Sequence, residues 1–341
     1  MDGSMDGAVF VQTNAPHNEV IAFRRDASGA LTRTGTYATG GAGNDAPHLT
    51  SQGSVTLTRD GRHLLVTNVS SDDVSVFAVT GDGLELAKMT PAGKAPKSVA
   101  EHDGLVVVLA TGEAAIRGFR LLDGDLEAIV GSAPSLSSPE ADGAQVGFTP
   151  DGRTVIVTER GTDRITAYAV GMDGVLGAPR DIASSGPTPY GFAISKGGTL
   201  VVTEAFRAER GAAAASSYRL EGDVIRPVTA SVGNGRSEIC WAVITPDGRW
   251  AFATNFADGA VSRYVLAADG SLSLEDATAG ITMDGRPGLR DEDLSADGRF
   301  LYAIDADQGA IVGWTVGDGG TLEPIGTWTG LAVTVAGLAA R

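Results

Sequence analysis

The amino-acid sequence predicts an all-β fold, a seven-bladed β-propeller with four antiparallel strands in each blade. Three observations support this prediction. One phrase recurs along the chain, its copies lie 43 to 50 residues apart, and the first blade lacks a strand that the end of the chain can supply. A period of about 40 to 50 residues with several short strands in each repeat is typical of propeller blades.

The repeated phrase is an alternating strand, an Asp-Gly turn and an apolar strand. Its clear copies are residues 55–68, 146–159, 242–255 and 292–305, and its weaker copies are residues 98–110 and 192–204. Asp-Gly between two alternating segments is a strong hairpin signal, because a type I′ turn needs a positive φ at both central residues. Each copy therefore predicts the first two strands of a blade.

A third strand that ends in an aromatic residue follows each clear copy, at residues 74–77, 165–168, 261–264 and 311–314. A glycine-rich turn and a fourth strand come next, as in residues 82–88 and 173–181. Four consecutive antiparallel strands make one blade.

The first blade lacks an innermost strand. Residues 8–41 supply only a second, third and fourth strand, whereas residues 333–339 resemble an innermost strand with nothing after it. We therefore expect the C-terminal strand to join the first blade, which closes the ring and removes two exposed sheet edges. Residues 8–341 then form a single domain, and residues 1–7 are expected to be a cloning remnant or a disordered start.

The charge balance excludes several classes of function. Lys and Arg number 26 against 42 Asp and Glu, which gives a net charge of −16. Such a chain repels phosphate backbones and anionic lipids, so we expect neither nucleic acid nor a membrane as a partner. The single cysteine, Cys240, excludes an internal disulfide and a cysteine-based zinc site. We expect a cytoplasmic monomer, or a secreted one if a signal peptide has been removed.

The topology sorts the four histidines by face. In a propeller, the turns between first and second strands lie on one face. The loops between blades, and those between second and third strands, lie on the other face, where ligands commonly bind. His17 and His48 are predicted on this ligand face, and His63 and His102 are predicted to be surface residues on the opposite face.

Polar side chains are predicted to surround the channel mouth at the ends of the second strands. Their shared position holds Asn14, Asn68, Glu159, Glu204, Asn255 and Asp305, with Ala110 in the third blade. Two interpretations stay open, because such side chains either hold loop amides or contact a ligand. We expect no cofactor, with Ca²⁺ or Mg²⁺ as the alternative, since carboxylate and amide oxygens suit these ions.

A second set of candidates lies at the upper ends of the innermost strands. Tyr190 and Trp241 offer aromatic surfaces on which a ligand can stack. The run of Arg290, Asp291, Glu292 and Asp293 places charges where the other blades have apolar or small residues. At an innermost strand the solvent is the channel itself, so this run is expected to face the channel.

These motifs resemble those of the lactonase-type seven-bladed propellers, which include 6-phosphogluconolactonase-like and carboxymuconate-lactonizing proteins. The resemblance covers residues 8–341 and rests on the TPDGR/ADGR phrase, the Asp-Gly-x-Leu fourth strand and the aromatic end of the third strand. It implies a site with a His, Arg residues and a Glu. Glu204 and Arg290 match that pattern, whereas Ala144 stands at the expected His and Tyr190 at an expected Arg.

Two functions are therefore in view. The first is lactone chemistry, either hydrolysis or ring closure by a lactonizing isomerase, on a small carboxylated substrate at the channel mouth. This chemistry needs an acid or base and a cation for the oxyanion, and the catalytic candidates are Glu204, Arg290 and His48. The predicted substrate-binding residues are His17, Tyr190, Trp241, Glu159, Asn68, Asn255, Asp305 and Asp291. The alternative is a non-catalytic propeller that binds a small molecule or a protein, which the departures at Ala144 and Tyr190 favour.

Overall fold

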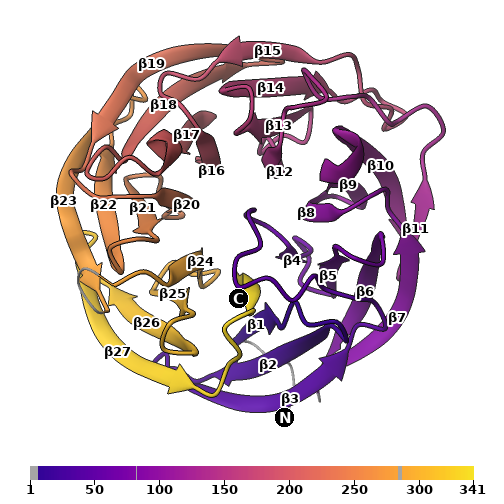
Figure 1. Cartoon of the computed structure of the whole chain (residues 1–341), viewed down its shortest axis with the longest axis horizontal. Helices are drawn as coiled ribbons and strands as arrows, with labels where there is room; N and C mark the ends of the chain where they lie inside the picture. The colour runs from indigo at the N-terminus through magenta and orange to yellow at the C-terminus, as the bar shows by residue number, and fades with distance from the viewer. Residues whose placement is uncertain (1–6, 82, 283–285) are drawn as a thin grey trace.

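Seven four-stranded antiparallel sheets surround a central axis in the computed structural model (Figure 1). The structure describes residues 7–81, 83–282 and 286–341. The seven sheets confirm the predicted propeller. Of the segment expected to be a cloning remnant, residues 1–6 lie outside the described residues.

Each blade runs from an innermost strand at the channel to an outermost strand at the rim. From inside to outside, blades I to IV are β28 (Ala336–Ala340), β1 (Ala8–Gln12), β2 (Glu19–Arg25) and β3 (Leu31–Ala38); β4 (Val55–Leu57), β5 (His63–Asn68), β6 (Asp73–Thr80) and β7 (Gly83–Pro91); β8 (Pro96–His102), β9 (Leu105–Ala110), β10 (Ala115–Leu122) and β11 (Asp125–Ala128); and β12 (Gly143–Phe148), β13 (Thr154–Glu159), β14 (Arg164–Ala169) and β15 (Arg180–Ala183). Blades V to VII are β16 (Pro189–Ile194), β17 (Thr199–Glu204), β18 (Ala214–Glu221) and β19 (Val224–Gly233); β20 (Ile239–Ile244), β21 (Trp250–Asn255), β22 (Ala260–Leu266) and β23 (Leu272–Ile281); and β24 (Leu289–Leu294), β25 (Phe300–Asp305), β26 (Ala310–Val316) and β27 (Leu322–Thr329).

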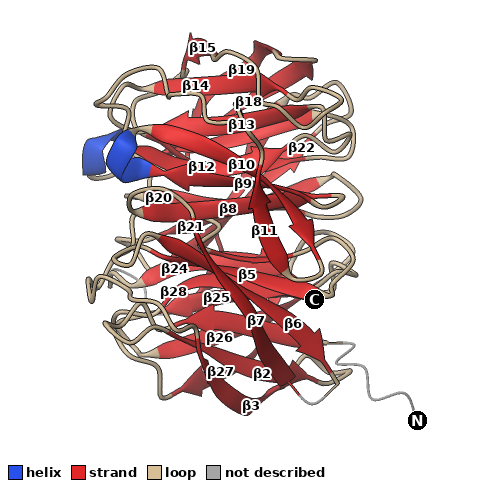
Figure 2. Ribbon diagram, turned by 90° about the vertical axis from the view of Figure 1, so that its right-hand side faces the viewer, coloured by secondary structure: helices blue, strands red, loops and turns tan. Residues whose placement is uncertain are grey.

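The two faces of the ring differ in their loops. We call the face with the loops between blades, and between second and third strands, the upper face, and the opposite one the lower face. The single-turn helices η1 (Thr111–Glu113) and η2 (Phe206–Ala208) lie in loops of the upper face, and the C-terminus lies toward the lower face (Figure 2).

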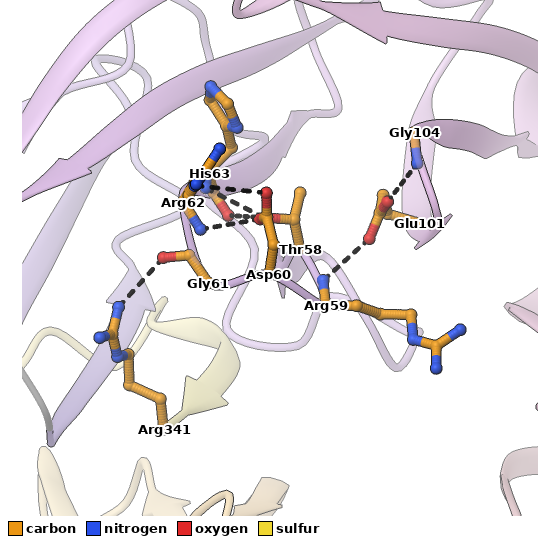
Figure 3. A network of polar contacts seen from close by, with 9 residues as sticks. All are labelled: Thr58, Arg59, Asp60, Gly61, Arg62, His63, Glu101, Gly104 and Arg341. Carbon is orange, nitrogen blue, oxygen red and sulfur yellow. Dashed lines mark hydrogen bonds and ion pairs between the residues drawn. The ribbon is translucent and has the colours of Figure 1, made fainter.

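The Asp-Gly turn of blade III has the predicted positive φ at both central residues, Asp103 (48°) and Gly104 (81°), whereas those of blades II, IV, VI and VII are built differently. Of the two central residues of the blade II turn, only Gly61 has a positive φ (69°), and the Asp60 carboxylate caps the turn instead. It accepts hydrogen bonds from the Thr58 hydroxyl (2.7 Å) and from the backbone N–H of Arg62 (2.9 Å) (Figure 3). The Asp-Gly pair is needed because the aspartate supplies this cap and glycine tolerates the left-handed conformation.

The C-terminal strand closes the ring, as predicted. β28 pairs antiparallel with β1, with Val9 opposite Ala340 and Val11 opposite Leu338. Leu338 is buried in a cluster that also holds Phe300 and Tyr302 of blade VII. The last strand therefore joins blade I by backbone hydrogen bonds and blade VII by apolar packing.

A long loop fills the upper end of the channel. The segment between β3 and β4 enters the centre of the ring (Figure 1), and we call its residues 42–53 the channel loop. The Trp241 indole donates a hydrogen bond to the Ser51 carbonyl (2.9 Å), and the Gln52 amide donates to the Ala242 carbonyl (2.9 Å). The loop thus rests against blade VI, which is separated by one blade from blade I, where the loop starts (Figure 1).

Loss of the closing contact should weaken the whole ring. We expect Leu338→Ala to lower the free energy of unfolding by about 2 to 5 kcal/mol, because a buried leucine leaves a cavity between blades I and VII. The matched control is Val333→Ala, since Val333 is 51% exposed and such a position changes stability by about 0.5 kcal/mol or less. Denaturant unfolding measures both. Equal stability of the two variants would show that β28 does not close the ring.

Candidate functional site

The upper mouth of the channel gathers several of the predicted site residues around His48. The His48 ring stacks on Phe256 with a centroid distance of 4.9 Å and an interplanar angle of 6°. Its Nε2 atom lies 3.4 Å from the Tyr190 hydroxyl, and Trp241 packs at a tilt against both rings. His48 comes from the channel loop, so the loop brings it to residues of blades V and VI.

Three cations surround this histidine. The Arg290 guanidinium lies 5.5 Å above the Phe256 ring and donates a hydrogen bond to the Pro47 carbonyl. The Arg160 guanidinium lies 5.2 Å from the centre of the Tyr190 ring and pairs with Asp142. The Lys97 ammonium donates a hydrogen bond to Thr50 (3.1 Å). Three cations therefore lie together at one mouth of a strongly acidic protein, and Asp142 balances the charge of one of them.

The electrostatics keep His48 uncharged. Burial, followed by the charges of Arg290, Arg160 and Lys97, lowers its pKa from 6.5 to about 4. Burial also raises the pKa of the Tyr190 phenol well above its usual value, so that group keeps its proton. The mouth thus holds a neutral imidazole, a neutral phenol and cationic groups, which is a set that can accept a proton, donate one and stabilise an anion.

The side chains at the ends of the second strands do not face the channel mouth, where they were predicted. Their side chains point away from the channel, toward the third strand and the segment that enters the same blade. Asn68 donates to Ser75 of β6 (2.8 Å) and accepts from Thr39 (2.8 Å). Asn255 donates to Ser262 of β22 (2.9 Å) and accepts from Asn234 (2.8 Å). We call Asn68, Glu159, Glu204 and Asn255 the polar anchors.

The two acidic anchors follow the same plan. Glu159 accepts from Thr166 of β14 (2.7 Å) and from the backbone N–H of Ser137 (3.0 Å). Glu204 accepts from Ser216 of β18, from Ser231 of β19 (2.5 Å) and from the backbone N–H of Gly186 (2.8 Å). Burial raises the pKa of Glu204. The two carboxylates therefore do not lie at the channel mouth, where they were predicted, because they accept hydrogen bonds from hydroxyl groups of the outer strands.

Other predicted residues are also distributed away from His48. Asp305 accepts hydrogen bonds from the backbone and the side chain of Gln308 in its own loop. His17 is exposed on the upper face, and Asn14 binds Asn44 at the start of the channel loop. On the lower face, His63 and His102 are both partly exposed, and the His102 ring packs against Phe148.

Sequence reasoning missed Arg160, Lys97 and Phe256 as members of the upper mouth. Arg160 directly follows the anchor Glu159, and Phe256 directly follows the anchor Asn255. The position after each second strand, rather than the last position within it, therefore points toward the mouth. A shift of one residue reverses the direction of the side chain, because successive side chains of a strand point to opposite sides.

A cavity of about 630 Å³ occupies the channel below the channel loop. Its walls come from β4, β8, β12, β24 and β28, and they include Asp291, Glu292 and Asp293. Burial raises the pKa of Asp291 and Asp293 to about 7 and that of Glu292 well above its usual value. Among residues 7–81, 83–282 and 286–341, no group of three or more His, Cys, Asp or Glu is arranged to hold a metal ion.

Family comparison agrees with this architecture. The family model described as "Lactonase, 7-bladed beta-propeller" matches residues 6–121 and 99–210, which together span more than half of the chain. The chain belongs to this lactonase family. No curated protein sequence matches the chain. Within the described residues of this family member, no helix is long and apolar enough to cross a membrane.

Solved structures share the fold along nearly the whole chain. A putative 6-phosphogluconolactonase from Bacteroides fragilis has a TM-score of 0.73 at 19% identity, covering 98% of both chains. A putative 6-phosphogluconolactonase from Bacteroides uniformis has a TM-score of 0.76 at 17% identity, covering 97% of this chain and 98% of that one. A periplasmic gluconolactonase from Pseudomonas aeruginosa has a TM-score of 0.72 at 16% identity, covering 98% of both. At such identities the likeness shows the fold alone.

The contacts of Glu204 predict a stability effect. We expect Glu204→Ala to lower the free energy of unfolding of this lactonase-family propeller by about 2 to 4 kcal/mol, since Gly186, Ser216 and Ser231 lose a buried acceptor. The exposed Glu209, in the adjacent loop, supplies the control variant Glu209→Ala. Thermal melting compares the two. A Glu204→Ala variant as stable as Glu209→Ala would contradict the anchoring role.

The buried acids predict a pH dependence. With a folded pKa of about 7 and an unfolded pKa of about 3.9, Asp291 binds its proton more tightly in the folded state. Its contribution to stability is therefore fully present below about pH 4 and is lost as the pH rises to about 7, by up to 1.4 kcal/mol per pH unit. Asp291→Asn should gain stability relative to the wild type across this window and keep a constant advantage above it. Unfolding measured from pH 4 to 8 checks this, and a pH-independent difference would refute it.

Proposed function

We propose that this propeller hydrolyses a small anionic lactone at the upper mouth of its channel, with His48 as the general base. One observation carries the proposal: an uncharged imidazole touches a phenol hydroxyl inside a group of three cations. Membership of the lactonase family supports lactone chemistry in general. The arrangement around His48 supports this location for it.

The cations favour an anionic substrate. Arg290 is buried, and its Nε atom has no hydrogen-bond partner within the part of the chain that the structure describes. A guanidinium of this kind is suited to a carboxylate or phosphate oxygen, because its planar donors match two acceptors at once. His48, Lys97 and Arg160 are only partly buried, so a substrate can reach them from the upper face. The charges of the mouth thus suit a substrate that carries a carboxylate.

The contact between His48 and Tyr190 suggests how protons would move. His48 takes a proton from a water molecule, and the resulting hydroxide attacks the lactone carbonyl. Arg290 holds the carboxylate of the substrate, and Lys97 stabilises the tetrahedral oxyanion. Tyr190 donates its proton to the leaving alkoxide as the ring opens, and the imidazolium of His48 returns a proton to Tyr190 across the 3.4 Å contact. The products are the hydroxy acid and the original protonation states of both residues. The same steps in reverse close a lactone.

Substrate binding should make His48 a stronger base. Its low pKa arises from burial and from Arg290, Arg160 and Lys97. A bound carboxylate offsets the three positive charges, which raises the pKa of the imidazole toward its usual value of 6.5. Proton transfer is therefore favoured only when an anion occupies the mouth.

A non-catalytic binding function is the second candidate. Two positions of the family pattern favour it, since Ala144 and Tyr190 occupy the places of a His and an Arg. The cationic mouth and its aromatic rings would then hold an anionic small molecule without converting it. Turnover measurements separate the two functions.

The test is hydrolysis of a panel of carboxylated and phosphorylated γ- and δ-lactones, followed by pH-stat. We expect His48→Ala to lower kcat by about 10² to 10⁴-fold, because the general base is lost. Tyr190→Phe should lower kcat with little change in KM, whereas Arg290→Lys should chiefly raise KM, since an ammonium cannot replace the planar fork. The acid limb of the kcat/KM profile should lie well below pH 6.5, the usual pKa of histidine.

His63→Ala is the matched control, because His63 lies in β5 beside a lower-face turn. Its kinetics should equal those of the wild type. Equal losses in His48→Ala and His63→Ala would contradict the assignment of the face. Binding of the lactones without turnover, weakened by Arg290→Lys, would favour the non-catalytic function instead.

A further inference from the structure

The rim of the upper mouth is built from a repeated pair of residues. In blades III to VII, the residue before the innermost strand has a positive φ. Its carbonyl accepts a hydrogen bond from the backbone N–H of the residue that follows the second strand of the same blade. We call these two residues a rim pair, and the five rim pairs are Ala95 with Thr111, Asp142 with Arg160, Thr188 with Ala205, Glu238 with Phe256, and Gly288 with Ala306. The backbone therefore fixes which two side chains are neighbours at the mouth.

The rim pair of blade IV is the one of these five that combines an acid with a base. The Asp142 carboxylate forms an ion pair with the Arg160 guanidinium. The turn itself does not require an acid, because alanine, threonine and glycine occupy the equivalent position in blades III, V and VII. The acid at position 142 therefore has a role other than the shape of the turn.

Asp142 acts on the cations of the mouth. Its partner Arg160 lies 5.2 Å from the centre of the Tyr190 ring, and the Tyr190 hydroxyl contacts His48. Burial lowers the pKa of the Lys97 ammonium, and the charge of Asp142 opposes that shift, whereas the charge of Arg160 adds to it. The Asp142 carboxylate therefore offsets positive charge on the part of the rim that holds Arg160 and Lys97.

Arg290 has a different environment. Its guanidinium donates a hydrogen bond to an uncharged acceptor, the Pro47 carbonyl, and stacks over Phe256. Exchange of this carbonyl for the carboxylate of a ligand gives a charge-assisted hydrogen bond, which is about twice as strong as a neutral one. Arg160 gains nothing comparable, because its acceptor is already the Asp142 carboxylate. Arg290 is therefore the better anion site of the two arginines.

We propose that Asp142 makes the upper mouth selective for a ligand with a single anionic group. This inference rests on the proposed function in that Arg290, in blade VII, binds the anion of the ligand. A second anionic group would approach Arg160 and Lys97, which blades IV and III contribute across the ring, and Asp142 would repel it because like charges brought together at a binding site cost free energy. A monocarboxylate lactone is therefore accepted, and a second carboxylate or a phosphate is disfavoured.

Isothermal titration of the full chain tests this selectivity with succinate, glutarate and adipate, each compared with its own monoamide. A monoamide has the shape of its dicarboxylate and one negative charge fewer. We expect the wild type to bind each monoamide at least as tightly as the dicarboxylate. Asp142→Asn should strengthen dicarboxylate binding by about fivefold or more and change monoamide binding by less than about twofold, because Arg160 is then free to pair with the second carboxylate.

The chain offers matched variants for this test. Asparagine tolerates a positive φ, and Asp142→Ala is a second variant, since alanine has the same conformation at Ala95 of blade III. Asp142→Asn/Arg160→Gln should lose the gain in dicarboxylate affinity, because the released guanidinium is absent. Asp163→Asn is the control: Asp163 also has a positive φ and also pairs with an arginine, Arg207, but it lies in the loop between β13 and β14. Both affinities should stay unchanged in this control.

Salt dependence separates an effect of charge from an effect of structure. The Asp142 side chain is 47% exposed, so the gain in Asp142→Asn should shrink in about 0.5 M NaCl, which screens exposed charges. A wild type that binds a dicarboxylate about tenfold more tightly than its monoamide would overturn the proposal. So would an unchanged preference in both Asp142 variants, or absence of binding by every probe.

These outcomes are distinct from failure of the proposed function. If the charge preference depends on Asp142 and no lactone is hydrolysed, the selectivity holds and the mouth is a binding site. If lactone hydrolysis depends on His48 and the charge preference does not depend on Asp142, the proposed function holds and the selectivity is refuted.

Discussion

The pairing of β28 with β1 is the contact on which the rest of the architecture depends. A propeller blade has two edges and two faces, and its neighbours cover the faces only if the ring is complete. Because β28 adds to the sheet of blade I and packs on Phe300 and Tyr302 of blade VII, the first and last blades share one core. The innermost strands then enclose a channel of defined width, and both the upper mouth and the lower cavity are consequences of that enclosure.

Polar contacts perform a second structural task that apolar packing cannot. The polar anchors Asn68, Glu159, Glu204 and Asn255 each join the end of a second strand to the third strand and to the incoming segment of the same blade. Buried carboxylates and amides need such partners, since an unpaired polar group in the interior is costly. The loops of the upper face are consequently held in place, including those that present Arg160 and Phe256 to the mouth.

The channel loop divides the axis into two regions of opposite character. Above it, Arg290, Arg160 and Lys97 surround a neutral imidazole, and below it the acids of β24 belong to the walls of a cavity. The boundary runs through the β24 strand itself, where Arg290 and Asp291 are consecutive residues. A β-bulge interrupts the strand between Arg290 and Glu292, and the same strand contributes residues to both ends of the channel. A protein with an overall charge of −16 thus has a group of cations at its upper mouth.

The sequence by itself determined the blade count, the four-stranded blades and the closure by the last strand. The repeat period, the turn residues and the alternation of apolar side chains are local signals that recur in each blade. It also determined that Arg290, Tyr190, Trp241 and His48 belong to one face. Only the tertiary structure decided which way the side chains at the ends of the second strands point. Glu204 and Glu159 accept hydrogen bonds from serines and threonines of outer strands, and the position of a residue in its strand does not show which side chain it will contact. The path of residues 42–53 across the channel was likewise decided in three dimensions, since a loop without periodicity carries no local signal of where it rests. The lower cavity depends on both, because the acids of β24 are visible in the sequence while the free space beside Asp291 arises only when five innermost strands and one loop are packed around it.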